Sequence, residues 1–305
     1  MFRKTIPPTL VLTAALLLNM TVTQTAFAQT APTTPTLASQ TMNTPRPLFF
    51  QDIAALDTTL HSKLTLPAQR KNFAFAAQAN LLPLTFAEVG QALHSFPIVF
   101  VADGNTVALV ALTDLQPGSN RFVNANGEWR AGAYIPAYVR GYPFMSVRAS
   151  EQAEPVLALD PQAADFKVPG GQALLLADGT PSEQLKGIMA FQGEYRMLAE
   201  RTRTMVQALK DAGVLEEGRL QLQPNTGGDA QAIGGFMVVS EAKLKALPTD
   251  ALKKLMDADA LGLAYAQMFS MGSLANLFAQ PALANADKPA SPVKTEPKRS
   301  GKKTQ

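Results

Sequence analysis

Aromatic and arginine side chains are concentrated in one segment, residues 121–144, and provide the best starting point for chemistry in this chain. The segment contains the only tryptophan of the protein, three of its five tyrosines and three arginines. These residue types contribute most of the binding energy at protein interfaces, and the planar guanidinium also pairs with carboxylates. We therefore predict a site for a ligand or partner, such as a sugar or peptide, formed by Trp129, Arg130, Tyr134, Arg140 and Tyr142.

The same segment also has a purely structural interpretation. Tryptophan is usually highly buried, so Trp129 would then fill the core where a sheet meets helices. The sequence Tyr142-Pro143-Phe144 would pack beside it. The residue types alone leave both interpretations open.

Recognisable catalytic and metal-binding motifs are missing from the sequence. The two histidines, His61 and His94, lie 33 residues apart and lack metal-ligand spacing. Neither a Gly-x-Ser-x-Gly nucleophile motif nor a glycine-rich phosphate motif occurs, and the pairs Gly170-Gly171 and Gly234-Gly235 are interpreted as turns. We therefore expect no metal and no cofactor.

Paired carboxylates are the one remaining route to catalysis. Glu128 could act with Asp103 or Asp114 if these side chains met across adjacent strands, as glycoside hydrolysis requires of its two carboxyl groups. The sequence does not place them at such a separation. Catalytic residues are therefore left unassigned.

The first half of the chain shows the pattern of short strands joined by tight turns. Asp103-Gly104-Asn105 lies between two β-branched runs, which is a strong hairpin signal because glycine tolerates positive φ. A second turn is expected at 124–127. The expected strands are 98–101, 106–112, 144–148, 156–159 and 173–176. Short connections favour antiparallel pairing.

The second half changes to helical spacing. A helix is expected from Pro181 to Gly213, with Thr180 as its cap and Glu183 completing a capping box. A hairpin follows, and then short helices, the last of them apolar over 261–278. We interpret this last helix as buried or partner-facing, because polar residues and two glycines interrupt it. The expected fold class is α+β, with an antiparallel sheet of short strands packed against one long capped helix and a C-terminal helical segment.

The N-terminus has the features of an export signal. Arg3 and Lys4 precede an apolar run over 9–20, and Ala26-Phe27-Ala28 provides the small residues of a cleavage site. We expect residues 1–28 to be a signal peptide, with Gln29 as the new N-terminus. This predicts a periplasmic or peripherally envelope-associated protein.

Two further low-complexity segments flank the expected domain at 48–280. Residues 29–47 are rich in threonine and proline and are interpreted as a spacer, and residues 281–305 as a basic disordered tail of net charge +4. The chain carries +3 in total, of which the signal peptide contributes +2 and the tail +4, so the expected folded part itself has about −3. A basic nucleic-acid surface is therefore not supported. The tail would offer peripheral contact with anionic membranes.

The order of several segments resembles the SapC family, whose proteins are associated with bacterial surface-layer export. The resemblance covers residues 49–278. It is carried by 72–76, 96–100, 107–112, 120–123, Gly127-Glu128-Trp129, Tyr134-Ile135-Pro136-Ala137, Arg140-Gly141-Tyr142-Pro143-Phe144, Asp178-Gly179-Thr180-Pro181-Ser182, 235–239 and 263–266. Gly141 departs from the family pattern, which often has arginine there.

The resemblance implies a non-catalytic accessory or binding protein of the cell envelope, linked to surface-layer or outer-membrane traffic. It implies no catalytic residues. The expected partner is an envelope protein or a glycan. The alternative is an enzyme that acts on an envelope glycan or peptide through carboxylates.

Overall fold

The computed structural model describes residues 46–148, 152–222 and 231–277, which form an α+β fold with antiparallel sheets, as predicted. The strands are β1 (Ala54–Ala55), β2 (Thr65–Leu66), β3 (Leu81–Pro83), β4 (Ile98–Asp103), β5 (Thr106–Leu112), β6 (Phe144–Val147), β7 (Val156–Leu159), β8 (Gln172–Ala173), β9 (Leu215–Leu222) and β10 (Gln231–Val239). The α-helices are α1 (Val89–Ala92), α2 (Ala137–Gly141), α3 (Glu183–Asp211), α4 (Glu241–Lys245), α5 (Thr249–Asp257) and α6 (Ala260–Ser270). The 3₁₀ turns include η3 (Phe86–Glu88) and η5 (Met271–Leu277).

The largest sheet has the strand order β3-β5-β4-β10-β9, with antiparallel pairs throughout. Its centre is the predicted hairpin, in which Asp103 pairs with Thr106 and Gly104 has φ +57°. Pro83 lies in the edge strand β3. Because this edge of the sheet has no further strand among the described residues, the missing N–H of proline costs no hydrogen bond between strands. The predicted turn at Gly234-Gly235 is wrong. These residues lie inside β10 at a β-bulge, where Gly235 supplies φ +83°.

Two small sheets complete the β-structure. One has the order β1-β7-β6 and the other pairs β2 with β8. The predicted strands at 144–148 and 156–159 are thus confirmed as β6 and β7. The expected strand at 173–176 is reduced to β8, since Leu175 forms only an isolated bridge with Pro181.

The long helix α3 is confirmed, but its predicted cap is wrong. Ser182 is the N-cap, and its hydroxyl accepts a hydrogen bond from Leu185 N at 3.3 Å. Thr180 belongs to the preceding turn, where its backbone N and hydroxyl both donate to Asp178. Gly213 follows the helix with φ +68°, which confirms the predicted stop. With 29 residues the helix is about 44 Å long.

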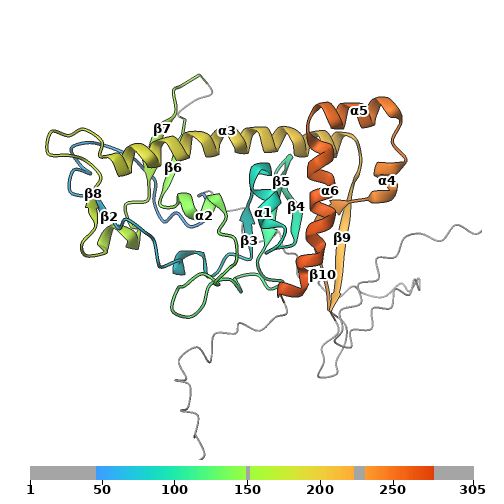
Figure 1. The fold of residues 1–305 in the computed structure, drawn as a ribbon, viewed down its shortest axis with the longest axis horizontal. Coiled ribbons are helices and arrows are strands. Elements are labelled where there is room, and N and C mark those ends of the chain that lie inside the picture. Colours follow the sequence, from blue (N-terminus) through green and yellow to red (C-terminus); the bar gives the residue numbers. More distant parts are fainter. Residues whose placement is uncertain (1–45, 149–151, 223–230, 278–305) are drawn as a thin grey trace, which may run out of the picture.

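Helix α3 connects the main core to a smaller one. Figure 1 shows it crossing the fold, with β2 and β8 near one end and α4–α6 near the other. Near its start, Leu185 packs with Phe144 and Leu159 in the smaller cluster, whereas Met205 and Leu209 belong to the main core. Between Leu185 and Thr202 only Gln192 is buried. The middle of α3 therefore lies between the two clusters and is only partly covered.

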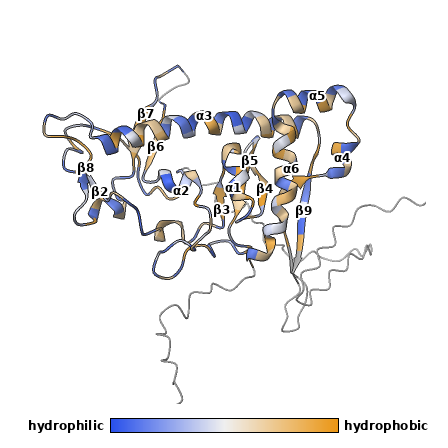
Figure 2. Cartoon of the chain, in the orientation of Figure 1, coloured by the Kyte–Doolittle hydropathy of each residue, from blue (hydrophilic) through white to orange (hydrophobic). Residues whose placement is uncertain are grey.

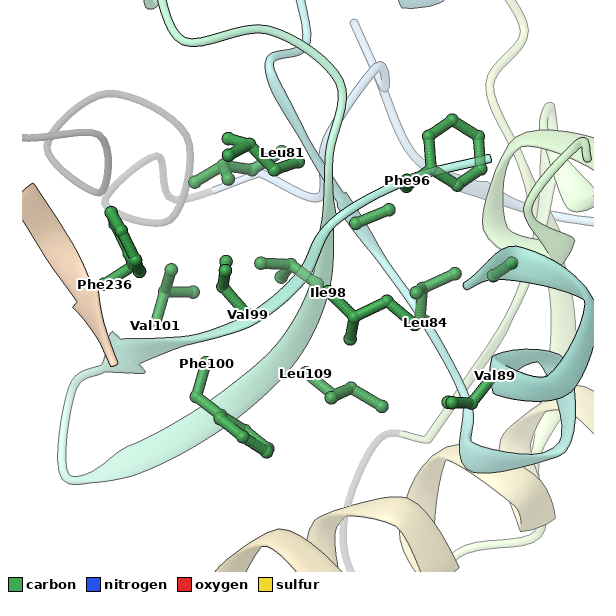
Figure 3. Close-up of a cluster of buried hydrophobic side chains, with 14 of the residues drawn as sticks. Leu81, Leu84, Val89, Phe96, Ile98, Val99, Phe100, Val101, Leu109 and Phe236 are labelled. Carbon is green, nitrogen blue, oxygen red and sulfur yellow. The ribbon is translucent and has the colours of Figure 1, made fainter. Parts of the chain in front are cut away.

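The main core forms around the β4–β5 hairpin. Phe96, Ile98 and Phe100 have no exposed surface, and Phe236 from β10 lies beside Val101 of the same hairpin (Figure 3). Each such side chain contributes roughly 1.5–3 kcal/mol through burial. This core fixes the segments on which the candidate site depends.

The C-terminal segment differs in part from the expected helix over 261–278. Helix α6 ends at Ser270, and the chain continues as η5. The side chain of Gln267 bonds to Val239 N and Ile98 O, so a polar residue connects α6 to the central sheet. Figure 2 shows mainly hydrophobic colouring along α6 and mixed colouring along α5. Among the described residues, every helix is too short or too polar to cross a bilayer.

Candidate binding site around helix α2

A buried carboxylate holds the start of α2. One Glu88 oxygen accepts hydrogen bonds from the backbone N and the hydroxyl of Thr85, at 2.9 and 2.8 Å. The other accepts from Ala137 N, at the first position of α2, and from the Tyr134 hydroxyl at 3.2 Å. Glu88 is only 5% exposed. Four donors therefore satisfy this carboxylate and connect η3 to α2.

An arginine holds the other end of α2. The Arg70 guanidinium donates to the carbonyl oxygens of Val139, Arg140 and Tyr142 and forms an ion pair with Asp165 at 3.2 Å. These carbonyls lie at the helix C-terminus, where a positive charge is favourable. Both ends of this five-residue helix are thus fixed by charged side chains from distant parts of the chain.

Helix α2 lies directly against the middle of α3. The buried Gln192 amide donates to the carbonyl oxygens of Gly141 and Phe144, at 3.0 and 2.7 Å. A Cβ at Gly141 would lie 2.7 Å from Gln192 Nε2 and 3.3 Å from the Phe191 ring. At this position, where the family pattern often has arginine, a side chain would therefore collide with α3 in this structure.

Tyr134 and Arg140, two of the predicted site residues, line the same cavity. The Arg140 guanidinium lies 5.4 Å from the Phe191 ring centre and 5.9 Å from that of Tyr134. Its Nε donates to Ile135 O at 3.1 Å, and one Nη donates to the Tyr134 hydroxyl at 3.3 Å. Burial, followed by the charge of Glu88, raises the pKa of Tyr134 above its usual value, so this hydroxyl stays protonated.

We call this cavity the Arg140 groove. Its volume is about 500 Å³, within the range of small-molecule and peptide sites. Its lining includes Glu88, Tyr134, Ile135, Arg140, Phe191 and Glu194. Arg140 is exposed and forms no ion pair with any described residue. Only two of its five N–H groups are used, so the others remain available to a carboxylate.

A model of the SapC family matches residues 56–277. The chain belongs to the SapC family. The match extends over all the elements from β2 to η5. No curated protein and no solved structure matches the chain significantly.

Segments that carry the SapC resemblance lie together near α2. Phe73 packs edge-on against Trp129, with ring centres 5.7 Å apart, and its backbone N donates to Gly127 O. Phe75 stacks on Tyr142, with ring centres 4.3 Å apart. Motifs that are far apart along the SapC chain therefore pack directly against one another.

The other three predicted site residues have structural contacts. Trp129 packs on the main core and donates from Nε1 to Tyr134 O at 3.1 Å. The Arg130 guanidinium covers the Phe122 ring at 4.2 Å and donates to Asn276 O, which attaches η5 to the loop. Tyr142 is 4% exposed. The structure thus separates these three from the Arg140 groove.

The SapC carboxylates considered for catalysis have local partners. Glu128 accepts a hydrogen bond from Asn124 in the turn that contains both, and Asp114 forms an ion pair with Arg121 at 3.1 Å. Asp103 lies at the hairpin turn. Within the described ranges, no three histidine or acidic residues come together as a metal site.

Glu88, Arg70 and Gln192 position α2, and the sequence did not single them out. Thr85-x-x-Glu88 has the form of a capping box, so it could have indicated the bonds between these two residues. No sequence signal connects Glu88 with Ala137, or Gln192 with Gly141. Those contacts arise only when α2 packs beneath α3.

Alkaline pH is expected to destabilise the SapC fold through Tyr138, Tyr142 and Tyr195. Burial is the main cause that raises their pKa above the usual value of about 10. Their stabilising effect is complete below pH 10. Above it the unfolded chain loses protons that the folded chain keeps, so stability falls by up to about 1.4 kcal/mol per pH unit for each tyrosine. Urea unfolding between about pH 9 and 11 will measure this decline. If Tyr138, Tyr142 and Tyr195 all lost their protons near pH 10 in the folded protein, the prediction would be contradicted.

Proposed function

We propose that this SapC-family protein is an exported, non-catalytic accessory protein of the cell envelope. In this proposal it binds an envelope protein through the Arg140 groove. The observation that carries the proposal is the Arg140 guanidinium, which is exposed yet held over two aromatic rings and free of ion pairs within the described residues. A cation positioned in this way is suited to a carboxylate on a partner.

The groove also supports the choice of a protein partner. Phe191 and Tyr134 offer flat aromatic surface beside the charge, as the centres of protein interfaces commonly do. Export is supported by the N-terminal sequence features described above.

Substitution of Arg140 by alanine is expected to reduce partner affinity at least tenfold without unfolding the protein. The side chain is exposed and loses only two hydrogen bonds and its contacts over the Phe191 and Tyr134 rings, so the free energy of unfolding should fall by about 1 kcal/mol or less. Crosslinking in intact cells, with a tagged full-length chain, will identify the envelope partner. Fractionation and N-terminal sequencing in the same cells will show whether the mature chain begins at Gln29.

Arg219 provides the matched control. It is an exposed arginine on β9, and Arg219→Ala should leave capture of the partner unchanged. Equal capture by wild-type protein and by folded Arg140→Ala would exclude the groove as the interface. Recovery of an uncleaved chain in the cytoplasm would exclude the exported role.

A further inference from the structure

A second cavity borders another side of the α2–α3 crossing, and we call it the Arg196 cleft. Its volume is about 260 Å³. It lies along the α3 residues Gln192, Arg196, Ala199 and Arg203, whereas the Arg140 groove lies along a neighbouring stripe of the same helix. Its walls include Phe50, Tyr138, Phe144, Met145, Tyr195 and Ala199.

Arg196 has a buried donor without an acceptor in this cleft. Its Nε is buried and forms no hydrogen bond with any described residue. Buried polar groups are almost always hydrogen-bonded, and a charged group left unpaired is among the most costly exceptions. Arg196 as a whole is only partly buried and lines the cleft, so the rest of its guanidinium is placed to meet an acceptor bound there.

The other charges of the cleft leave Arg196 as its unneutralised group. Arg203 forms an ion pair with Glu200, which lines the same cavity. One positive charge thus remains opposite largely apolar walls. The complementary ligand has one anionic end and an apolar body, and a carboxylate matches the planar fork of a guanidinium in two parallel hydrogen bonds.

We propose that the Arg196 cleft binds the carboxylate end of a small amphiphile, with its hydrocarbon chain against Phe50 and Met145. The cleft is slightly smaller than most ligand sites, which are about 300–1,000 Å³. It therefore suits a ligand of about ten non-hydrogen atoms, the size of octanoate. The cleft shares Ala137 and Tyr195 with the Arg140 groove, but its charge comes from Arg196 instead of Arg140.

Octanoate binding to the full chain, measured by calorimetry and by thermal unfolding, tests the proposal. Octanoate is expected to bind and to raise Tm, while 1-octanol binds at least tenfold more weakly because it lacks the anionic group. Inorganic phosphate alone separates simple anion binding from amphiphile binding. Phosphate that binds as tightly as octanoate would overturn the assigned ligand class.

Arg196→Met is the decisive variant. It keeps a long apolar stem and removes the unsatisfied donor, so octanoate affinity should fall at least tenfold while Tm of the ligand-free protein stays constant or rises. Arg201→Met, on the same helix but outside the cleft, should bind octanoate like wild type. Arg140→Ala should also keep octanoate binding, which separates this test from that of the partner interface.

Two results would overturn the proposal. One is unchanged octanoate affinity in Arg196→Met. The other is a wild-type protein that does not bind octanoate. If the Tm of Arg196→Met then also fell by more than about 5 °C, the arginine would have only a structural role.

Discussion

Replacement of Glu88 by alanine is expected to destabilise the protein by about 3–5 kcal/mol. The substitution leaves the buried N–H groups of Thr85 and Ala137 and the Tyr134 hydroxyl without their acceptor. Hydrogen bonds to a charged group contribute roughly 1.5–3 kcal/mol each, and buried donors without a partner add their own penalty. Urea unfolding followed by circular dichroism will measure the loss.

Glu88→Gln refines this test because it preserves shape. One carboxylate oxygen becomes an NH₂ group that faces donors instead of accepting from them, so a loss of about 2–3 kcal/mol is expected. Glu194→Ala is the matched control. Glu194 lines the same groove but is exposed, and its loss should cost less than about 0.5 kcal/mol. If the free energy of unfolding of Glu88→Ala lay within about 1 kcal/mol of that of wild type, the anchoring role of Glu88 would be refuted.

The second large effect is expected from Gly141→Ala, at about 2–3 kcal/mol of destabilisation. The new methyl group would overlap the Gln192 amide, which would have to leave its two carbonyl acceptors. Gly141 does not have positive φ, so the backbone itself accepts alanine. The expected loss therefore comes from the contact with α3 alone.

A double-mutant cycle isolates this contact. In a Gln192→Ala background the overlap is gone, so adding Gly141→Ala should cost less than about 0.5 kcal/mol, and the coupling energy should be about 2 kcal/mol. Gly193→Ala on α3 is the control. Nothing lies within 4 Å of its added Cβ, and it should stabilise the helix by about 0.5–1 kcal/mol. Simple additivity in the cycle would show that Gly141 and Gln192 are not coupled.

Local signals explain which parts of the fold could be predicted from the sequence. The turn at Gly104 and the helix stop at Gly213 both depend on a glycine with positive φ between regular segments, and both predictions are confirmed. The cap of α3 was misplaced by two residues because Thr180 and Ser182 are equally good capping types. The choice between them depends on Asp178, which engages Thr180 in a turn.

The candidate site was less accessible to sequence reasoning because its contacts span long separations. Trp129, Tyr134 and Arg140 have similar binding potential as residue types. Only packing turns Trp129 toward the core and leaves Arg140 over Phe191. Arg196 carried no signal at all, since an isolated arginine on a helix is ordinarily solvated.

The position of α3 also has a mechanical consequence. Leu185 is anchored in one core cluster and Leu209 in the other, about 36 Å apart along a single rigid rod. Near its middle, Gln192 bonds to Gly141 in α2 and to Phe144 in β6. The helix is therefore held at its two ends by separate core clusters and at one point near its middle by α2 and β6. A tilt of α3 about Gln192 would displace the two clusters in opposite directions. The motions of the two ends of the molecule would then be coupled, although the two clusters are not in contact.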